Sequence, residues 1–445
     1  MSPSGSAAER RLGWAYLAVA LVMGAAVVAG TSGTLLGPTV SGVIAVVLLL
    51  ACGALTLGAA RWIPGLLFTL TPAVCVFNTR HGFFPFDYVV FALAFYLILD
   101  ALWRGDLSLP GPRSLHLAFL AVIASGLLTL FLARELSSFA GHLKRVIVGY
   151  LAMVIVFRFA DRERWPWFAL SIPVSGLAIA FLVIGVYLRR GFLVHKAYEL
   201  RTFYSNVGWG SSNYVAAVLS LALLGSVILI VLTTRPWLRI VSALSLLPMG
   251  LAMALLVSRG TLVAVALGLL GLVVAVGGKR RWGFLALGAL GAVLLTQLPV
   301  FKVILLRFTL ESQNFSYYAR LVGWKLAFQR FVEHPLLGVG LGQGKFQTDA
   351  LSNLDPHNYL LSVASETGIL GLVAWIALLW IVFQTARDAA RGDPARKTWA
   401  ISLGVLLAVA VLHSCYEPTF AGANYFFLLF WIAAILHRAA DPVPS

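Results

Sequence analysis

Long stretches of this chain carry no charged residue and have no polar face. Ile44–Leu57 and Thr261–Val276 are apolar on every side, whereas the strands of a membrane β-barrel would alternate apolar and polar residues. Hydrophobic residues make up 60% of the 445 residues and charged residues 11%, against about 25% charged residues in a soluble domain. A soluble enzyme, a disordered protein and a disulfide-rich secreted module are therefore excluded. The pattern predicts an all-α polytopic integral membrane protein.

The number of spans follows from the length of the apolar runs, because a transmembrane helix needs about 20 mostly apolar residues. Candidate spans begin near residues 13, 41, 63, 85, 115, 146, 166, 213, 238, 261, 282, 358, 399 and 422. The runs near residues 63, 146 and 261 are short, so we expect a bundle of about 12 to 14 transmembrane helices. No small-residue cleavage site closes the first run convincingly, and we expect it to be a retained span.

The charged residues between the apolar runs indicate the orientation of the chain. If the N-terminus lies in the cytoplasm, every short loop on that side is basic, as the positive-inside rule requires. Since much of the net charge of +16 is then topological, we expect no nucleic-acid partner. These loops hold Arg61; Arg104 and Arg113; Arg158, Arg162 and Arg164; Arg235 and Arg239; Lys279, Arg280 and Arg281; Arg387, Arg391, Arg396 and Lys397; and Arg438.

A second group of basic residues is expected on the opposite, outer side, where topology disfavours positive charge. We expect this group to bind an anionic ligand, and solvated loop charge is the alternative for any single member. Its members are Arg80, His81, Arg134, His142, Lys144, Arg145, Arg189, Arg190, His195, Lys196, Arg201, Arg259, Lys302, Arg307, Arg320, Lys325, Arg330, His334 and Lys345.

Residues 301–356 are the one expected extramembrane segment of domain-like size. They separate a transmembrane bundle of about 11 spans in residues 1–300 from the last three spans in residues 357–445. Tyr317–Phe331 predicts an amphipathic helix that lies on the membrane or caps the bundle. Its apolar face would carry Ala319, Val322, Gly323, Leu326, Ala327 and Phe331.

Glycine alternates through the run His334–Gly344. The run fails the dinucleotide-binding fingerprint, because Gln343 and Lys345 fall where the third glycine would be and no strand precedes it. We interpret it as a flexible glycine turn that lets the backbone approach a neighbour closely.

The sharpest motif is Asp355-Pro356-His357-Asn358, directly before an apolar run. Asp355 suits an N-cap and Pro356 the first helical position, which would place His357 in the first turn at the outer end of a span. The helix dipole disfavours imidazolium there, so a neutral His357 could act as a general base. A structural, hydrogen-bonded histidine is the alternative. At about 100° per residue, one helix face carries His357, Leu361, Ala364, Gly368 and Gly371.

These residues resemble the signature of bacterial O-antigen ligases and the related Wzy-type polymerases. The signature is His-Asn, nine residues, then Gly-x-x-Gly, and it corresponds here to His357-Asn358 and Gly368-x-x-Gly371. Ser258-Arg259-Gly260, and Arg320-x-x-Gly323-Trp324 before the run from His334 to Gly340, also resemble that superfamily. The resemblance covers roughly residues 200 to 437.

The resemblance implies a glycosyltransferase of the GT-C type in the bacterial inner membrane, with one large periplasmic loop and its active site on the periplasmic face. The donor would be a glycan on undecaprenyl diphosphate, the acceptor a sugar hydroxyl such as that of lipid A–core, and no metal or other cofactor would be needed. His357 would be the catalytic base in an inverting reaction. The diphosphate would be held by Arg259, Arg320, Arg201 and Arg307, with Asn358, Gly368, Gly371 and Ser258 in supporting roles.

Four functions are compatible with these features: an O-antigen ligase, an O-antigen or exopolysaccharide polymerase, a protein O-oligosaccharyltransferase, and a flippase or other transporter of lipid-linked oligosaccharides. The long outer loop beside the His-Asn motif argues against a transporter, and so does the lack of an internal repeat. We expect a ligase. All four would have membrane lipids as neighbours.

The other polar residues of the apolar runs indicate no metal site. The cysteines Cys52, Cys75 and Cys415 are few and scattered, and His413 has no further ligand near it in sequence. The acidic residues Asp349, Asp355, Glu366 and Glu417 are dispersed. Glu366, nine residues after His357, lies on another side of a regular helix, so we expect it to make a buried polar contact rather than to pair with His357.

Overall fold

A computed structural model describes residues 85–105, 108–160, 164–189, 212–298, 301–302, 305, 314–346, 355–389, 391, 394–415, 433–434 and 438. These residues contain helices and turns and no β-strand, as the all-α prediction requires. The expected spans near residues 13, 41, 63 and 422 lie outside the described residues. The helices are α4 (Pro85–Arg104), α5 (Arg113–Leu127), η1 (Leu130–Leu132), α6 (Leu136–Phe159), α7 (Trp165–Arg189), α9 (Ser212–Leu232), α10 (Pro236–Leu256), α11 (Arg259–Val276), α12 (Arg280–Gln297), α14 (Asn314–Glu333), α15 (Tyr359–Ala389) and α16 (Pro394–Ser414).

Eight helical segments in the described part of the chain are long and apolar enough to cross a membrane. They are α5 with η1, α6, α7, α9, α10, α11, α15 and α16. Helix α4, at the expected span near residue 85, is not among the eight, and neither is helix α12, which forms at the expected span near residue 282. Its 18 residues include Arg280, Arg281 and Gln297, which lower its mean hydropathy. The protein is therefore a multi-pass membrane protein, as predicted.

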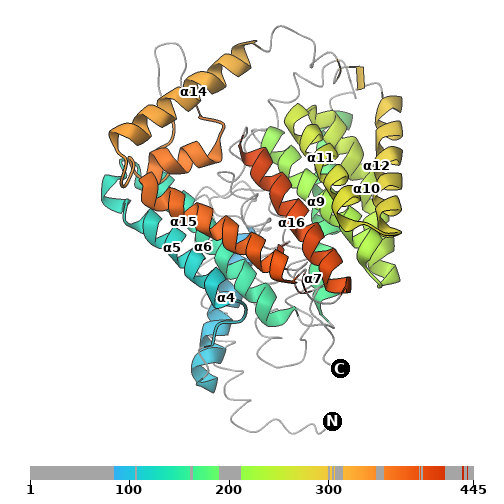
Figure 1. Ribbon diagram of the computed structural model, residues 1–445, viewed down its shortest axis with the longest axis horizontal. Coiled ribbons are helices and arrows are strands. Elements are labelled where there is room, and N and C mark those ends of the chain that lie inside the picture. Colours follow the sequence, from blue (N-terminus) through green and yellow to red (C-terminus); the bar gives the residue numbers. More distant parts are fainter. Residues whose placement is uncertain are drawn as a thin grey trace.

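The helices form two groups joined by α16 (Figure 1). One group contains α4, α5, α6, α14 and α15, and the other contains α7, α9, α10, α11 and α12. Helix α16 packs against α15 of the first group and against α9 and α11 of the second. Small residues allow the close approach: a Cβ on Gly268 of α11 would lie 2.9 Å from Leu224 of α9 and 3.0 Å from Val409 of α16.

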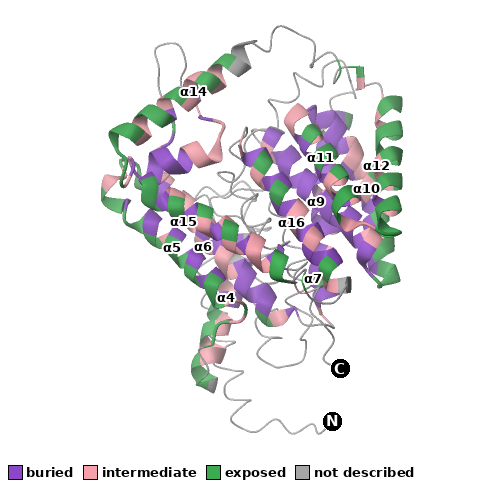
Figure 2. Ribbon diagram, viewed as in Figure 1, coloured by how far each residue is buried: buried purple, intermediate pink, exposed green. Residues whose placement is uncertain are grey.

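Burial follows the pattern expected of a helix bundle in lipid. Figure 2 shows buried residues on the facing sides of the helices and exposed residues on their outer sides. Several large hydrophobic side chains point outward, such as Leu244 (69% exposed), Val274 (74%) and Trp380 (62%). Such surfaces are unfavourable in water and match an apolar bilayer. The buried hydroxyls of Ser220 and Thr367 donate to carbonyl oxygens of their own helices, so they cost little in this environment.

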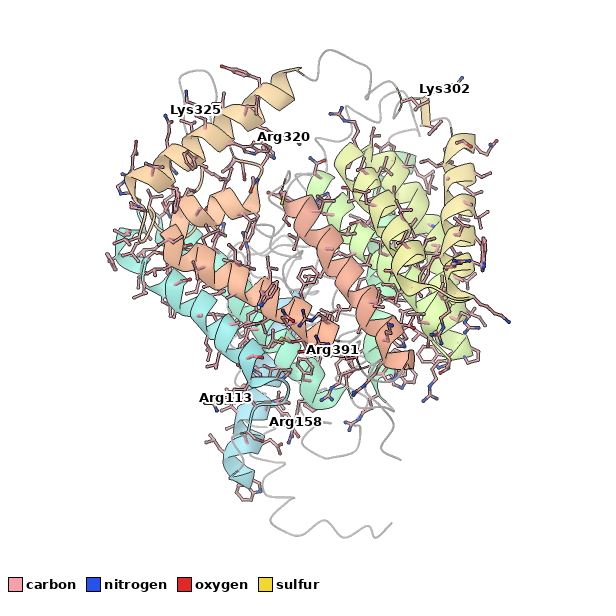
Figure 3. All side chains as sticks on the ribbon, viewed as in Figure 1. Arg113, Arg158, Lys302, Arg320, Lys325 and Arg391 are labelled. Atoms are coloured by element: carbon pink, nitrogen blue, oxygen red, sulfur yellow. The ribbon has the colours of Figure 1, made fainter. Side chains whose placement is uncertain are left out.

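The basic residues labelled in Figure 3 lie at two ends of the bundle, as the sequence predicts for them. Arg113, Arg158 and Arg391, expected in cytoplasmic loops, lie at one end in Figure 3, whereas Lys302, Arg320 and Lys325 lie at the opposite end. That the end with Lys302, Arg320 and Lys325 faces the periplasm stays a prediction.

Helix α6 begins earlier than the sequence suggests. The expected span starts near residue 146, with the basic residues before it in a loop, but the helix begins at Leu136 and includes His142, Lys144 and Arg145. Lys144 Nζ lies 2.6 Å from Asp87 Oδ2 of α4, and both side chains are largely buried. Because the charge is paired with an acid from another helix, the span tolerates it.

Helix α15 is broken at Gly368, where φ is 63° and ψ is −160°. We call residues 334–344 the glycine loop. It packs directly against the break, since a Cβ on Gly368 would overlap the carbonyl group of Leu336. The sequence predicts one helix face that runs from His357 to Gly371. This prediction is wrong beyond Gly368, because the regular rotation of the helix stops there.

We expect Gly368→Ala to lower the free energy of unfolding by about 1–3 kcal/mol from its backbone conformation alone, since this region of φ and ψ is essentially restricted to glycine. Overlap with Leu336 adds to that cost. The measurement is the thermal unfolding midpoint in detergent. Gly404→Ala in α16 is the matched control, because nothing lies within 4 Å of its Cβ position. An unchanged midpoint for Gly368→Ala would contradict this account of the break.

Candidate functional site

The start of α15 differs from the prediction. The helix begins at Tyr359, and Asn358 is its N-cap, since Asn358 Oδ1 accepts a hydrogen bond of 3.1 Å from the N–H of Leu361. Asp355 is not the cap. Its Oδ1 instead accepts a hydrogen bond of 2.9 Å from the N–H of His357, which closes a local turn. His357 has φ of 51°, and this left-handed conformation prevents a helix from starting before Asn358.

His357 is therefore the residue before the cap, and it is partly buried. Its backbone is held from two sides. The side chain of Asp355 fixes the turn, and α14 lies against the same turn, because a Cβ on Gly323 would be 3.0 Å from both Asp355 O and Pro356 Cα. A positive φ is uncommon outside glycine. Conformations of this kind cluster at functional sites, where the surrounding structure maintains them.

Helix α14 forms where the sequence predicts an amphipathic helix, and it covers the bundle with the predicted face. Ala327 is fully buried and forms a small cluster with Phe346. The partly buried neighbours of that cluster are Ala319, Val322, Leu326 and Leu361. Because Leu361 belongs to the first turn of α15, this cluster fixes α14 on the part of α15 that follows His357.

Arg320 lies one turn before Gly323 on α14, so the two residues share a face. Gly323 contacts Asp355 and Pro356, so Arg320 lies one helical turn along α14 from this contact. In Figure 3, Arg320 points from α14 toward the space between the two helix groups, whereas Lys325 points away from it. Lys325 is exposed, and Arg320 is partly buried.

A cavity of about 90 Å³ lies between α5, α6, the glycine loop and the start of α15. Asp355, Pro356 and Tyr359, which flank His357 in the sequence, all line it. The other polar and charged lining residues are Ser125, Ser138, His142, Arg145, Lys345, Ser362, Glu366 and Thr367. Two basic side chains, Arg145 and Lys345, and two carboxyl groups, Asp355 and Glu366, therefore meet beside the His357 turn.

Arg145, Lys345 and His142 belong to the outer basic group predicted from the sequence and line this cavity, but they are not among the predicted site residues. Arg145 enters the cavity because α6 extends toward Leu136. Its signal in the sequence is a guanidinium directly before the apolar run Val146–Phe157, and an ionisable group inside a membrane-spanning helix indicates a functional position. Lys345 follows the glycine loop directly, and the loop brings it to the cavity.

Another basic residue of that outer group has a structural role. Arg330 of α14 donates from Nη1 to the carbonyl of Gln343 at 2.9 Å, and its guanidinium lies 3.9 Å from the ring centre of Phe346. Burial lowers the pKa of Arg330, and the Glu366 carboxylate partly offsets this effect. The guanidinium still remains charged at neutral pH. Arg330 thus connects α14 to the glycine loop.

Glu366 makes the buried polar contact that the sequence predicts. Its side chain is 8% exposed, and Oε2 accepts a hydrogen bond of 2.7 Å from the N–H of Gly342. Gly371, the other glycine of the signature, follows one turn after the break. A Cβ there would overlap the hydroxyl of Thr367, so this position also requires a small residue.

Ser258 and Arg259 begin α11 in the second helix group. Ser258 Oγ lies 2.9 Å from Thr261 Oγ1, which lies 3.0 Å from Nε2 of His413 near the end of α16. The short connection from α15 to α16 places the start of α15 and the end of α16 at one end of the bundle. Arg259 is therefore at the same end as His357, with α16 between their helices. The candidates Arg201 and Arg307 lie outside the described residues.

Residues 243–376 match the family model described as O-antigen ligase. Through this segment the chain is similar to the O-antigen ligase superfamily. The matched residues run from α10 to α15 and include Ser258, Arg259, Arg320, His357 and Gly368. No curated protein matches the chain. The resemblance predicted from the sequence is thus confirmed, and the match supports a membrane function of the ligase or polymerase type, with glycosyl transfer in general.

Proposed function

We propose that the protein is an O-antigen ligase of the GT-C type in the bacterial inner membrane. It transfers a glycan from undecaprenyl diphosphate to a sugar hydroxyl, such as one on lipid A–core, at the periplasmic face. The observation that carries this proposal lies in the family segment. In that segment, His357 is held in a left-handed turn. The turn adjoins a cavity that is lined by Lys345 of the same segment and by Arg145 of α6. This arrangement suits a base beside a diphosphate.

His357 is the catalytic base in this proposal. Its imidazole accepts the proton of the acceptor hydroxyl while that oxygen attacks the anomeric carbon of the donor. The bond between this carbon and the diphosphate oxygen breaks, and the undecaprenyl diphosphate leaves with the electron pair. Attack opposite to the leaving group inverts the anomeric carbon. The fixed turn at His357 reduces the freedom that the imidazole must lose on reaching the hydroxyl.

Basic side chains stabilise the departing diphosphate, whose negative charge grows as the bond breaks. Arg320 is the first candidate because it lies on the face of α14 that contacts the His357 turn. Arg145 and Lys345 extend the positive charge into the cavity. Arg259, Arg201 and Arg307 remain further candidates. Guanidinium groups bind phosphate oxygens in pairs and act strongly in a partly dry site, so the proposed reaction uses no metal ion.

We expect His357→Ala to lower kcat for glycan transfer roughly 10²- to 10⁴-fold, the contribution typical of a general base. The assay uses purified protein in proteoliposomes with a lipid-linked glycan donor. His334→Ala is the control, because His334 is exposed and directly follows α14. If the His357→Ala protein kept the wild-type rate, the assignment of the base would be wrong.

We expect Arg320→Ala to weaken donor use by roughly tenfold or more, since it removes charged hydrogen bonds to the diphosphate. The readout is kcat/KM for the donor, together with direct donor binding. Lys325→Ala is the matched control, because it removes one positive charge from the opposite side of the same helix. Equal effects of the two substitutions would show a general influence of charge and would count against a diphosphate site at Arg320.

A polymerase is the second candidate, because the His-Asn signature resembles both branches of the superfamily. Deletion of the gene distinguishes them through the surface glycan. We expect a ligase mutant to lose all attached polymer while lipid-linked chains accumulate. Single repeats on the acceptor would instead identify a polymerase. Glycan missing from proteins, with lipid A–core still modified, would identify a protein O-oligosaccharyltransferase. The match to the O-antigen ligase model argues against the transporter alternative.

A further inference from the structure

A carboxylate lines the same cavity as the cationic groups. Glu366 lies there with Arg145 and Lys345, and a negative charge at this place opposes the binding of an anionic donor. The orientation of its oxygens resolves the conflict, because they face the glycine loop. Oε2 accepts the N–H of Gly342 at 2.7 Å. Oε1 lies against Gly344, where a Cβ would overlap it.

The backbone beside Glu366 pairs with the same loop. In a regular helix the carbonyl of Ser365 would accept the N–H of Ile369. The break at Gly368 turns that N–H to Pro335 O instead, at 2.8 Å. Ser365 O then accepts the N–H of Val339 at 3.0 Å. Glu366 O likewise accepts the N–H of Gly340 at 2.9 Å.

On the side away from α15, the glycine loop is held by α6 and by Thr129, which lies between α5 and η1. Ser138 Oγ of α6 donates to Gly342 O at 2.7 Å, and the N–H of Leu341 donates to Thr129 Oγ1 at 3.0 Å. Backbone pairing holds the first half of the loop to α15. The other end of the loop leads to Lys345. There, the hydrogen bond from the N–H of Gly342 to the Glu366 side chain joins the loop to α15.

We propose that Glu366 is a positioning residue that holds the end of the glycine loop against α15. It thereby sets Lys345 and the cavity wall at a fixed place relative to His357. This inference rests on the proposed function, glycan transfer beside this cavity. Glu366 does not touch the reacting atoms. Its effect passes through Gly342 to the loop.

The first test measures loop position without measuring activity. Hydrogen–deuterium exchange is followed in the full-length protein in nanodiscs, on peptides that cover residues 339–344. In Glu366→Ala we expect the amide of Gly342 to exchange at least roughly tenfold faster, because it loses its buried acceptor. Ser365→Ala is the control, since it removes a neighbouring buried hydroxyl that bonds within α15, to Ser362 O.

The second test separates positioning from folding. For Glu366→Ala, we expect kcat per folded molecule to fall roughly 10- to 100-fold, the scale of a small misplacement of catalytic groups. We expect KM for the donor to change by less than about threefold, because Arg320 and Arg145 keep their places when the end of the loop is released. Glu366→Gln keeps the length of the side chain and an oxygen acceptor for Gly342. It should therefore recover most of the rate and most of the exchange protection, and it replaces the alanine variant if that variant fails to fold.

The outcomes distinguish this proposal from the proposed function. If His357→Ala stays active while Glu366→Ala releases the loop and slows transfer, the base assignment fails and the role of Glu366 stands. If the loop amides of Glu366→Ala exchange at the wild-type rate, the positioning role is overturned. It is overturned equally if kcat per folded molecule stays at the wild-type value or if Glu366→Gln is as impaired as the alanine variant.

Discussion

The structure of the site depends on the exchange of backbone hydrogen bonds at the break in α15. A broken helix inside a membrane protein leaves carbonyl and N–H groups that lipid cannot satisfy. Here the glycine loop satisfies them: Val339 and Gly340 donate to the carbonyls of Ser365 and Glu366, and Ile369 donates to Pro335. The break and the loop are therefore one unit. Without the loop the break would be costly, and without the break the loop would have no partner on α15.

This pairing also explains the glycines of the loop in a way that the sequence does not. We interpreted the run as a flexible turn that approaches a neighbour closely. The close approach is confirmed, but the glycines serve tight contact: Gly338, Gly340 and Gly342 all have positive φ, and a Cβ on each would press on Glu366, Ala133 or Ser138. The loop is thus packed on both sides. Its conformation follows from its neighbours on α6 and α15 rather than from freedom of its own backbone.

Much of the architecture could be predicted from the sequence, because apolar length and charge are local properties. They predict the described spans, the apolar face of α14 and the separation of Arg113 and Arg320 to opposite ends. The errors share one physical cause. Lys144 is tolerated inside α6 because Asp87 pairs with it from 57 positions away, and Asn358 replaces Asp355 as the cap because α14 and Asp355 hold His357 in a left-handed turn. Such contacts depend on the folded chain, and no local pattern contains them.

The same contacts give a physical meaning to the spacing of the His-Asn signature. The nine residues between Asn358 and Gly368 are the whole helical segment between its cap and its break. At about 1.5 Å per residue this segment is about 14 Å long. Asn358 fixes the end that carries His357, and Gly368 fixes the end at which the glycine loop pairs. Insertion of one residue would turn one end relative to the other by about 100° and would separate His357 from the cavity or Glu366 from Gly342. The spacing of the signature is therefore the length of a rigid helical connection between His357 and the glycine loop, which Lys345 directly follows.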